Sequence, residues 1–315
     1  MQIFLLLFML PVGLPLLALG LEHWRWIRQR RQAKVEIPGV EGAQIHVCRR
    51  HLEKAPVVFV LETGLARVPA QMDWLLRLGD EGYGVLLYDR PGTGWSDPCT
   101  DSDVEANSQI LNGVLDRLGV RVPVIMVGYS VGALYARTFA ACFPERVRAM
   151  ALLDPVLPGD QGAGGGRWGR ILGRYERHLR LKAWGARLGL LRRPFTRGAD
   201  RQDPALLSGH HWSGAAAEAR RLPRAREKVA RIPLTASLPL QVISASLPAE
   251  PWRREWNGMH ASLAVAAGGH HLICTDADHT SLVDDTRHQE RILQALKDLA
   301  ERAGQDTVSE TGELH

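Results

Sequence analysis

The sequence predicts an α/β fold with a mostly parallel sheet, helices on both faces of that sheet, an inserted helical cap and an N-terminal transmembrane helix. Three observations support this prediction. From residue 35 onward, short apolar runs rich in Val, Ile and Leu alternate with helical patterns, which is typical of βαβ units. Residues 158–231 interrupt that alternation with an arginine-rich, helix-prone segment, and residues 3–21 carry no charge.

The chain is expected to have five parts. Residues 1–34 form a membrane anchor with a basic flank, 35–157 the first part of the core, 158–231 the cap, 232–303 the second part of the core, and 304–315 a disordered polar tail. A chain of 315 residues is long enough for one large α/β domain with an insertion, so we expect a single core.

The N-terminal segment has the composition of a membrane span. As a helix rising ~1.5 Å per residue, the uncharged residues 3–21 would cross the roughly 30 Å hydrocarbon core of a bilayer. The aromatic and basic flank from Trp24 to Lys34 puts the positive charge on the C-terminal side, which predicts a single-pass protein with its folded domain in the cytoplasm. The alternative is a cleaved signal peptide and a secreted or periplasmic protein, for which Ala18 and Gly20 offer a cleavage site.

The overall composition is that of a globular protein, with 45% apolar and 23% charged residues. Its four cysteines lie far apart, without the spacing of a metal site and without the pattern of a disulfide framework. We therefore expect ordinary thiols and no bound metal.

Periodicity places the elements of the core. The expected strands are Gln44–Arg49, Pro56–Glu62, Gly84–Tyr88, Val122–Val127, Ala149–Leu153, Leu238–Ser244 and His271–Thr275. The expected helices are Gln71–Gly79, Val104–Leu118, Val131–Ala141 and Gln289–Arg302. Residues that follow these strands should meet at the carboxyl edge of the sheet.

The strongest motif lies where an expected strand runs into an expected helix. Residues 128–132 read Gly-Tyr-Ser-Val-Gly, a G-x-S-x-G pattern. Such a turn is tight enough to strain the serine backbone, so the residues two before and two after it must lack side chains. The turn would expose Ser130 above a helix N-terminus, where developing negative charge is stabilised. We interpret Ser130 as a nucleophile and not as part of a structural Gly-Ser turn.

A serine hydroxyl needs a base to take its proton, and in this type of fold the histidine comes late in the chain. His279 follows the last expected strand and precedes the last helix, so it should lie at the same edge as Ser130. His270 and His271 would lie at the opposite edge. His210 and His211 belong to the cap, where contact with a substrate or with solvent is their expected role.

The acid that orients this histidine has two candidates. The usual position follows the strand Leu238–Ser244, where the sequence offers no carboxylate before Glu250. Asp154 directly follows the preceding strand and also lies at the carboxyl edge, where it could hold the imidazole tautomer. We favour Asp154 over Glu250, and a dyad assisted by another group is the third possibility.

A tetrahedral intermediate also needs two backbone N–H donors. The residue after the nucleophile, Val131, supplies the first. The second should come from the turn that follows the strand Pro56–Glu62, and the Leu65 amide is the candidate because Gly64 lets the chain turn there.

These motifs resemble those of the α/β-hydrolase superfamily over about residues 40–300. Residues 61–65 (Leu-Glu-Thr-Gly-Leu) are similar to a bacterial branch of that superfamily, and residues 88–97 resemble its D-R-x-G-x-G-x-S-D turn, in which Asp89 and Asp97 are structural. In that branch the triad carboxylate follows the strand after the helix that begins at the G-x-S-x-G turn, which implies Asp154.

The sequence also departs from the superfamily pattern. Asp278 stands where a glycine commonly precedes the histidine, and Thr286 stands where a proline is common. A serine at position 130 argues against the related epoxide hydrolases and dehalogenases, which attack with an aspartate.

The resemblance implies a serine hydrolase that cleaves an ester or thioester through an acyl-enzyme, without metal or organic cofactor. An amidase, a peptidase or a cofactor-free haloperoxidase would use the same residues. A non-catalytic, membrane-tethered binding protein is the alternative from a different class.

The cap is strongly basic. From Pro158 to Arg231 it contains 15 Arg and 2 Lys against 6 Asp or Glu. A solvated helical face is one interpretation, and nucleic acid binding is not expected because no recognised motif accompanies the charge. The other interpretation is a surface that lies on an anionic bilayer, with a lipid-like acyl substrate.

Overall fold

The computed structural model describes residues 2–33, 37–40, 42–99, 103–158, 165–192, 203–233 and 238–311. Among these residues, seven strands form one sheet in the order β3-β5-β4-β6-β7-β8-β9. Their bounds are β3 Val47–Arg50, β4 Val58–Glu62, β5 Gly84–Tyr88, β6 Val124–Tyr129, β7 Val147–Leu153, β8 Leu240–Ala245 and β9 His270–Cys274. Only β3 runs antiparallel to its neighbour, so the prediction of a mostly parallel sheet is confirmed.

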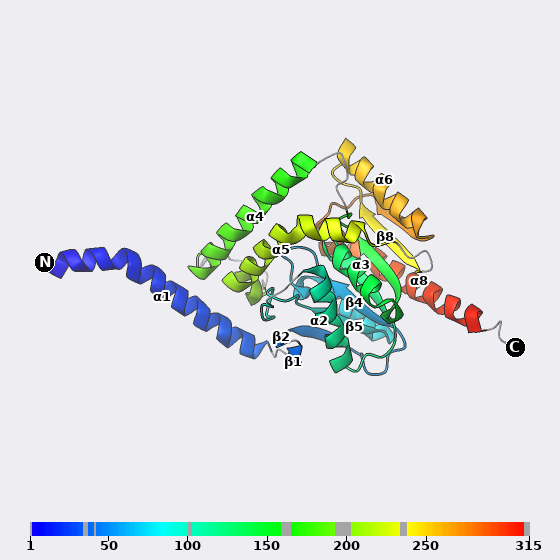
Figure 1. The fold of residues 1–315 in the computed structure, drawn as a ribbon, viewed down its shortest axis with the longest axis horizontal. Helices are drawn as coiled ribbons and strands as arrows, with labels where there is room; N and C mark the ends of the chain where they lie inside the picture. Colours follow the sequence, from blue (N-terminus) through cyan, green and yellow to red (C-terminus); the bar gives the residue numbers. More distant parts are fainter. Residues whose placement is uncertain are drawn as a thin grey trace.

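Helices cover both faces of this sheet (Figure 1). They are η1 Pro69–Glu81, α2 Val104–Arg117, α3 Gly132–Cys142, η2 Pro144–Arg146, α6 Pro251–Ala266, α7 Ser281–Asp284 and α8 Thr286–Thr311. In β4, Val58 and Val60 pack in the core beneath α2 and α3, whereas Phe59 and Leu61 pack in the core beneath η1 and α8. A strand that is apolar at every position is therefore buried on both faces.

The start of the core differs from the single expected strand Gln44–Arg49. The chain there forms β2 (Ala43–Ile45), which pairs with β1 (Ile37–Val40), and then β3, which pairs with β5. The change of partner occurs at His46, whose Nδ1 lies 2.8 Å from the Asp89 carboxylate.

The carboxyl-terminal helix is longer than expected. It continues to Thr311, so residues 304–311, expected to be disordered, are helical, and 312–315 lie outside the described residues. Helix α6 has no counterpart among the expected elements.

The cap segment, residues 158–231, lies between β7 and β8 in the chain. Its described elements are α4 (Gly165–Arg187), η3 (Pro204–Leu207) and α5 (Gly209–Ala230). Helices α4 and α5 pack on each other through a small apolar cluster that includes Leu179, Ala183, Trp212 and Ala215. Two of its basic groups pair with carboxylates outside the cap: Lys228 with Asp103 and Glu105, and Arg192 with Glu22.

The predicted transmembrane helix is wrong. In the part of the chain that the structure describes, no helix is sufficiently long and apolar to cross a membrane. The N-terminal segment forms α1 (Gln2–Gln32), and its uncharged stretch ends at Leu21. The next residue, Glu22, is buried against the cap and pairs with Arg192 at 2.7 Å. The predicted single-pass membrane location and the predicted orientation both depended on that helix, so they are wrong as well.

Candidate active site

The turn between β6 and α3 has the strained geometry that its glycines predict. Ser130 has a φ of 56°, in the left-handed region. A Cβ on Gly132 would lie 2.1 Å from the Glu62 carbonyl oxygen, and a Cβ on Gly128 would lie 2.8 Å from the Ala133 Cα. The two glycines therefore let the turn approach β4 and α3 closely, which presents Ser130 at the carboxyl edge of the sheet.

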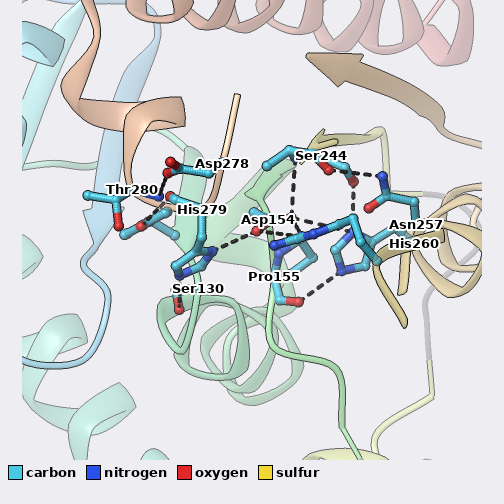
Figure 2. Close-up of polar contacts among 12 residues, drawn as sticks. Ser130, Asp154, Pro155, Ser244, Asn257, His260, Asp278, His279 and Thr280 are labelled. Carbon is cyan, nitrogen blue, oxygen red and sulfur yellow. Dashed lines mark hydrogen bonds and ion pairs between the residues drawn. The ribbon is translucent and has the colours of Figure 1, made fainter. Parts of the chain in front are cut away.

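Three predicted residues meet at this edge (Figure 2). The Ser130 Oγ lies 3.0 Å from His279 Nε2, and His279 Nδ1 lies 2.6 Å from Asp154 Oδ2. His279 comes from the loop after β9, and Asp154 follows β7 directly. The three side chains come from loops after three different strands, because parallel strands end at a common edge.

The hydrogen bonds fix the tautomer of His279. An ionised carboxylate only accepts, so Nδ1 donates to Asp154, and the neutral imidazole then accepts the Ser130 hydroxyl proton at Nε2. The His279 side chain is 41% exposed, whereas the Asp154 side chain is almost fully buried. This arrangement can take a proton from a nucleophile on its open side.

A buried arginine helps to keep Asp154 ionised. Burial alone would raise the pKa of the Asp154 carboxyl, but the hydrogen bond and charge of His279, together with Arg253, lower that pKa below its usual value. Arg253 Nη1 donates to both carboxylate oxygens, at 2.9 and 3.0 Å, and the Ala245 amide donates to Oδ1 at 3.3 Å.

Helix α6 brings further polar groups behind Asp154. The His260 side chain is fully buried, with Nε2 2.9 Å from the Pro155 carbonyl and Nδ1 2.7 Å from Ser244 Oγ. Burial lowers the pKa of His260 to about 4, so this histidine is neutral near pH 7. Figure 2 shows Asp154 between His279 and this group. Sequence reasoning missed Arg253 and His260, because their contact with Asp154 depends on how α6 packs.

The alternative acid, Glu250, has a different position. It is exposed and stands directly before the first turn of α6. Among the residues that the structure describes, the carboxylate hydrogen-bonded to His279 is that of Asp154.

The turn after β4 lies against the turn between β6 and α3. We call residues 63–66 the oxyanion turn. A Cβ on Gly64 would lie 2.8 Å from the Tyr129 ring and 3.4 Å from the Ser130 Cβ, so only a glycine fits without displacing them. Within the described ranges, no acceptor is paired with the backbone amide of Leu65 or of Val131. Both predicted donors are thus available near Ser130.

The residues around His279 hold its loop in place. The Tyr129 hydroxyl donates to the His279 carbonyl at 2.7 Å, and the two rings stack with centroids 5.0 Å apart. The Asp278 carboxylate accepts from the backbone amides of Thr280 and Ser281. It therefore caps the start of α7 and does not form a hydrogen bond with the imidazole.

The remaining candidate histidines are placed elsewhere. His271 Nε2 lies 2.8 Å from Ser244 Oγ, and β9 begins one residue earlier, at His270. His210 Nε2 lies 2.8 Å from the Ser96 carbonyl, and His211 is fully buried between the cap and the core. Among the described side chains, no cluster of three His, Cys, Asp or Glu is suited to a metal ion.

A buried carboxylate beside the oxyanion turn gives a pH prediction. Burial raises the pKa of Glu62 to about 7 from 4.5, although Arg90 and Tyr88 lower it. The native state therefore binds a proton between about pH 7 and 4.5 that the unfolded chain does not bind. Relative to Glu62→Gln, the wild type should gain roughly 3 kcal/mol of unfolding free energy as the pH falls through this window, and nothing more below it. Urea unfolding of both proteins at pH 8 and pH 5 measures this difference, and an unchanged difference would contradict the prediction.

Comparison with known proteins gives the family of this chain. A profile described as the alpha/beta hydrolase family matches residues 62–302. A 2-hydroxy-6-oxononadienedioate/2-hydroxy-6-oxononatrienedioate hydrolase of Paraburkholderia phymatum is 45% identical over 74 residues, which are 23% of this chain and 25% of that protein. The corresponding hydrolase of Burkholderia vietnamiensis is 40% identical over 93 residues, 29% of this chain and 31% of that protein. The alignments thus span between a quarter and a third of these relatives.

Solved structures share the fold at low sequence identity. A carboxylesterase of Nitrososphaera gargenis has a TM-score of 0.64 at 13% identity, covering 84% of this chain and 99% of its own. An enol-lactonase of Burkholderia xenovorans has a TM-score of 0.59 at 20% identity, covering 83% and 98%. An epoxide hydrolase of Vigna radiata has a TM-score of 0.58 at 16% identity, covering 84% and 96%. The matched profile spans well over half of the chain, so this protein belongs to the alpha/beta hydrolase family.

Proposed function

We propose that this protein cleaves an ester or thioester through an acyl-enzyme on Ser130. His279 acts as the base, and Asp154 is the carboxylate that orients the imidazole. The observation that carries the proposal is the continuous hydrogen-bonded line from Ser130 Oγ through the imidazole to the Asp154 carboxylate. That line joins a strained serine at a helix N-terminus to a base with a fixed tautomer, which is the arrangement that acyl transfer requires.

The reaction follows from these positions. The Ser130 Oγ attacks the acyl carbon while its proton passes to His279 Nε2, and the carbonyl electron pair moves to the oxygen. The amides of Leu65 and Val131 stabilise the resulting oxyanion. Collapse of this intermediate expels the alcohol or thiol, which takes the proton from His279. A water molecule, deprotonated by the same imidazole, then releases the acid and regenerates Ser130.

The test is covalent labelling followed by a substrate series. A fluorophosphonate probe is expected to label the wild type once, at Ser130. Among p-nitrophenyl esters, thioesters and p-nitroanilides with matched acyl groups, esters and thioesters should be cleaved and anilides should not. Equal rates on anilides would contradict the ester assignment, and a protein that neither labels nor turns over any of these compounds would contradict the proposal as a whole.

A second candidate is hydrolysis of a 2-hydroxy-6-oxo-dienedioate, because relatives named for such substrates match this chain at 40–45% identity over the aligned residues. It uses the same serine and histidine. Including a 2-hydroxy-6-oxononadienedioate in the series separates the two: turnover of that compound with no turnover of the esters would favour the second candidate.

A further inference from the structure

A buried arginine lies beneath the oxyanion turn and binds its carbonyl groups. Arg90 Nη1 donates to the Thr63 carbonyl at 2.8 Å and to the Thr63 hydroxyl at 3.2 Å, and Nη2 donates to the Gly64 carbonyl at 3.4 Å. Arg90 is only 4% exposed. It comes from the 88–97 turn, and the groups it binds belong to the 61–65 motif, so it joins two motifs that the triad does not explain.

These contacts fix the direction of the predicted oxyanion donor. In a planar trans peptide the C=O and the N–H point to opposite sides. The Gly64 carbonyl and the Leu65 amide belong to one peptide unit, so holding that oxygen toward Arg90 directs the Leu65 N–H away from it. Gly64 itself packs against the Tyr129 ring and close to Ser130. The position of the Arg90 side chain therefore decides where the Leu65 donor points.

Arg90 is held in turn by the cap. Its Nη2 lies 2.7 Å from Glu218 Oε1 on α5, and its Nη1 lies 3.3 Å from Glu62 Oε2 on β4. Glu218 is 5% exposed and Glu62 is fully buried. A guanidinium removed from water requires a close counter-ion, and Glu218 is the nearer of the two. The Tyr135 ring, 4.5 Å from the guanidinium carbon, covers another side of it.

The same cap helix binds the other end of the oxyanion turn. The Gly94 amide donates to His211 Nδ1 at 3.1 Å, so the neutral ring carries its proton on Nε2 and donates it to the Ala66 carbonyl at 3.2 Å. Burial lowers the pKa of His211 to about 4, which keeps the ring neutral near pH 7. Ala66 has a φ of 60°, a strained conformation that such contacts maintain.

We propose that Arg90 is a positioning residue for the oxyanion hole, and that the cap helix α5 holds it in place through Glu218. The proposal rests on the proposed function, because it concerns the donor that would stabilise the oxyanion. It makes the cap part of the machinery that orients the Leu65 amide, in addition to any role it has over the substrate.

The test compares a transition-state analogue with a substrate. An aryl trifluoromethyl ketone accepts the Ser130 Oγ at its carbonyl carbon, the hydroxyl proton passes to His279, and the electron pair on the former carbonyl oxygen makes an oxyanion in the same hole. A p-nitrophenyl ester with the same acyl group reports kcat and KM. A misdirected Leu65 amide weakens the hemiketal and the transition state together, and leaves binding of the neutral ester unchanged.

Arg90→Met is expected to lower kcat by about 10- to 100-fold, below the 100- to 1,000-fold cost of deleting an oxyanion donor outright. KM should change less than threefold, and the inhibition constant of the ketone should rise by the same factor by which kcat/KM falls. Arg90→Lys should recover part of the loss, because an ammonium can donate to the Thr63 carbonyl but lacks the second arm of the guanidinium. Glu218→Gln should lower kcat severalfold in the same manner.

Two matched controls separate positioning from general damage. Arg137 is also a buried arginine, but its hydrogen bond goes to the Ile232 carbonyl and not to the oxyanion turn. Arg137→Met should therefore leave kcat and the ketone constant within about twofold. Glu227 is an exposed carboxylate on the same helix as Glu218, and Glu227→Gln should behave as the wild type. If Arg90→Met does not fold, the kcat and ketone inhibition constants of Arg90→Lys and Glu218→Gln are compared with those of the wild type instead.

The proposal is overturned if folded Arg90 variants keep the wild-type kcat, if kcat falls without a parallel rise in the ketone constant, or if Arg137→Met produces the same losses. These outcomes leave Ser130 labelling intact, so they do not touch the proposed function. A wild type that binds neither fluorophosphonate nor ketone overturns both.

Discussion

Ser130→Ala is expected to lower kcat/KM by about 10,000-fold or more, since the members of a triad act as a unit and what remains comes from the oxyanion hole and binding. Covalent labelling by a fluorophosphonate should disappear. Alanine at this position meets the same positive φ as serine, and the lost hydroxyl is bonded only to His279 among the described residues, so the melting temperature should change little.

His279→Ala should cost a similar factor, because the Ser130 hydroxyl then has no base. Tyr129→Phe is the matched control at this loop: it removes the hydrogen bond to the His279 carbonyl but keeps the ring stacked on the imidazole, so its loss should be far smaller. Steady-state kinetics on the preferred ester measures all three variants. Substantial turnover by Ser130→Ala would show that another residue is the nucleophile.

Asp154→Asn is expected to lower kcat by roughly 10,000-fold, because an amide can donate to Nδ1 and thereby stabilise the wrong tautomer of His279. It should also destabilise the fold by about 3–5 kcal/mol, since Arg253 loses the carboxylate that balances its buried charge. Kinetics and urea unfolding measure the two effects separately.

Two further variants separate the effect on stability from the effect on catalysis and test the alternative carboxylate. Adding Arg253→Met to Asp154→Asn removes the uncompensated cation, so the double variant should recover stability without recovering activity. Glu250→Gln changes an exposed carboxylate at the start of α6 and should retain near wild-type turnover. If Glu250→Gln loses turnover while Asp154→Asn keeps it, the carboxylate that orients His279 is Glu250 and not Asp154.

The predicted membrane span is wrong because composition alone does not show which surface a segment contacts. The sequence showed an uncharged run and a basic flank, and both are local properties. The flank is also where α1 contacts the folded protein: Arg30 pairs with Asp97 at 2.8 Å, and the Trp26 ring lies 4.9 Å from the His210 ring. Whether a basic and aromatic stretch faces lipid or the protein's own cap is a question of tertiary contact that hydropathy does not address.

The sequence by itself determined the local chemistry of the site. A tight strand-to-helix turn requires glycines at 128 and 132, and the structure shows the contacts that a Cβ would make there. The alternation of apolar strands and helices determined a parallel sheet, and this placed Ser130, Asp154 and His279 at one edge. These properties depend on neighbouring residues and on the order of the strands, so they can be predicted from the sequence pattern.

Only the tertiary structure decided which side chains meet across long sequence separations. Asp154 lies 2.6 Å from an imidazole 125 residues away, whereas Glu250, also after a strand, remains exposed. Arg253 beneath Asp154 and Glu218 beside Arg90 carry no motif, because each is a charged residue of an ordinary helix until that helix packs. Their roles depend on burial, where a charge needs a partner within a few ångströms, and burial is a property of the folded chain.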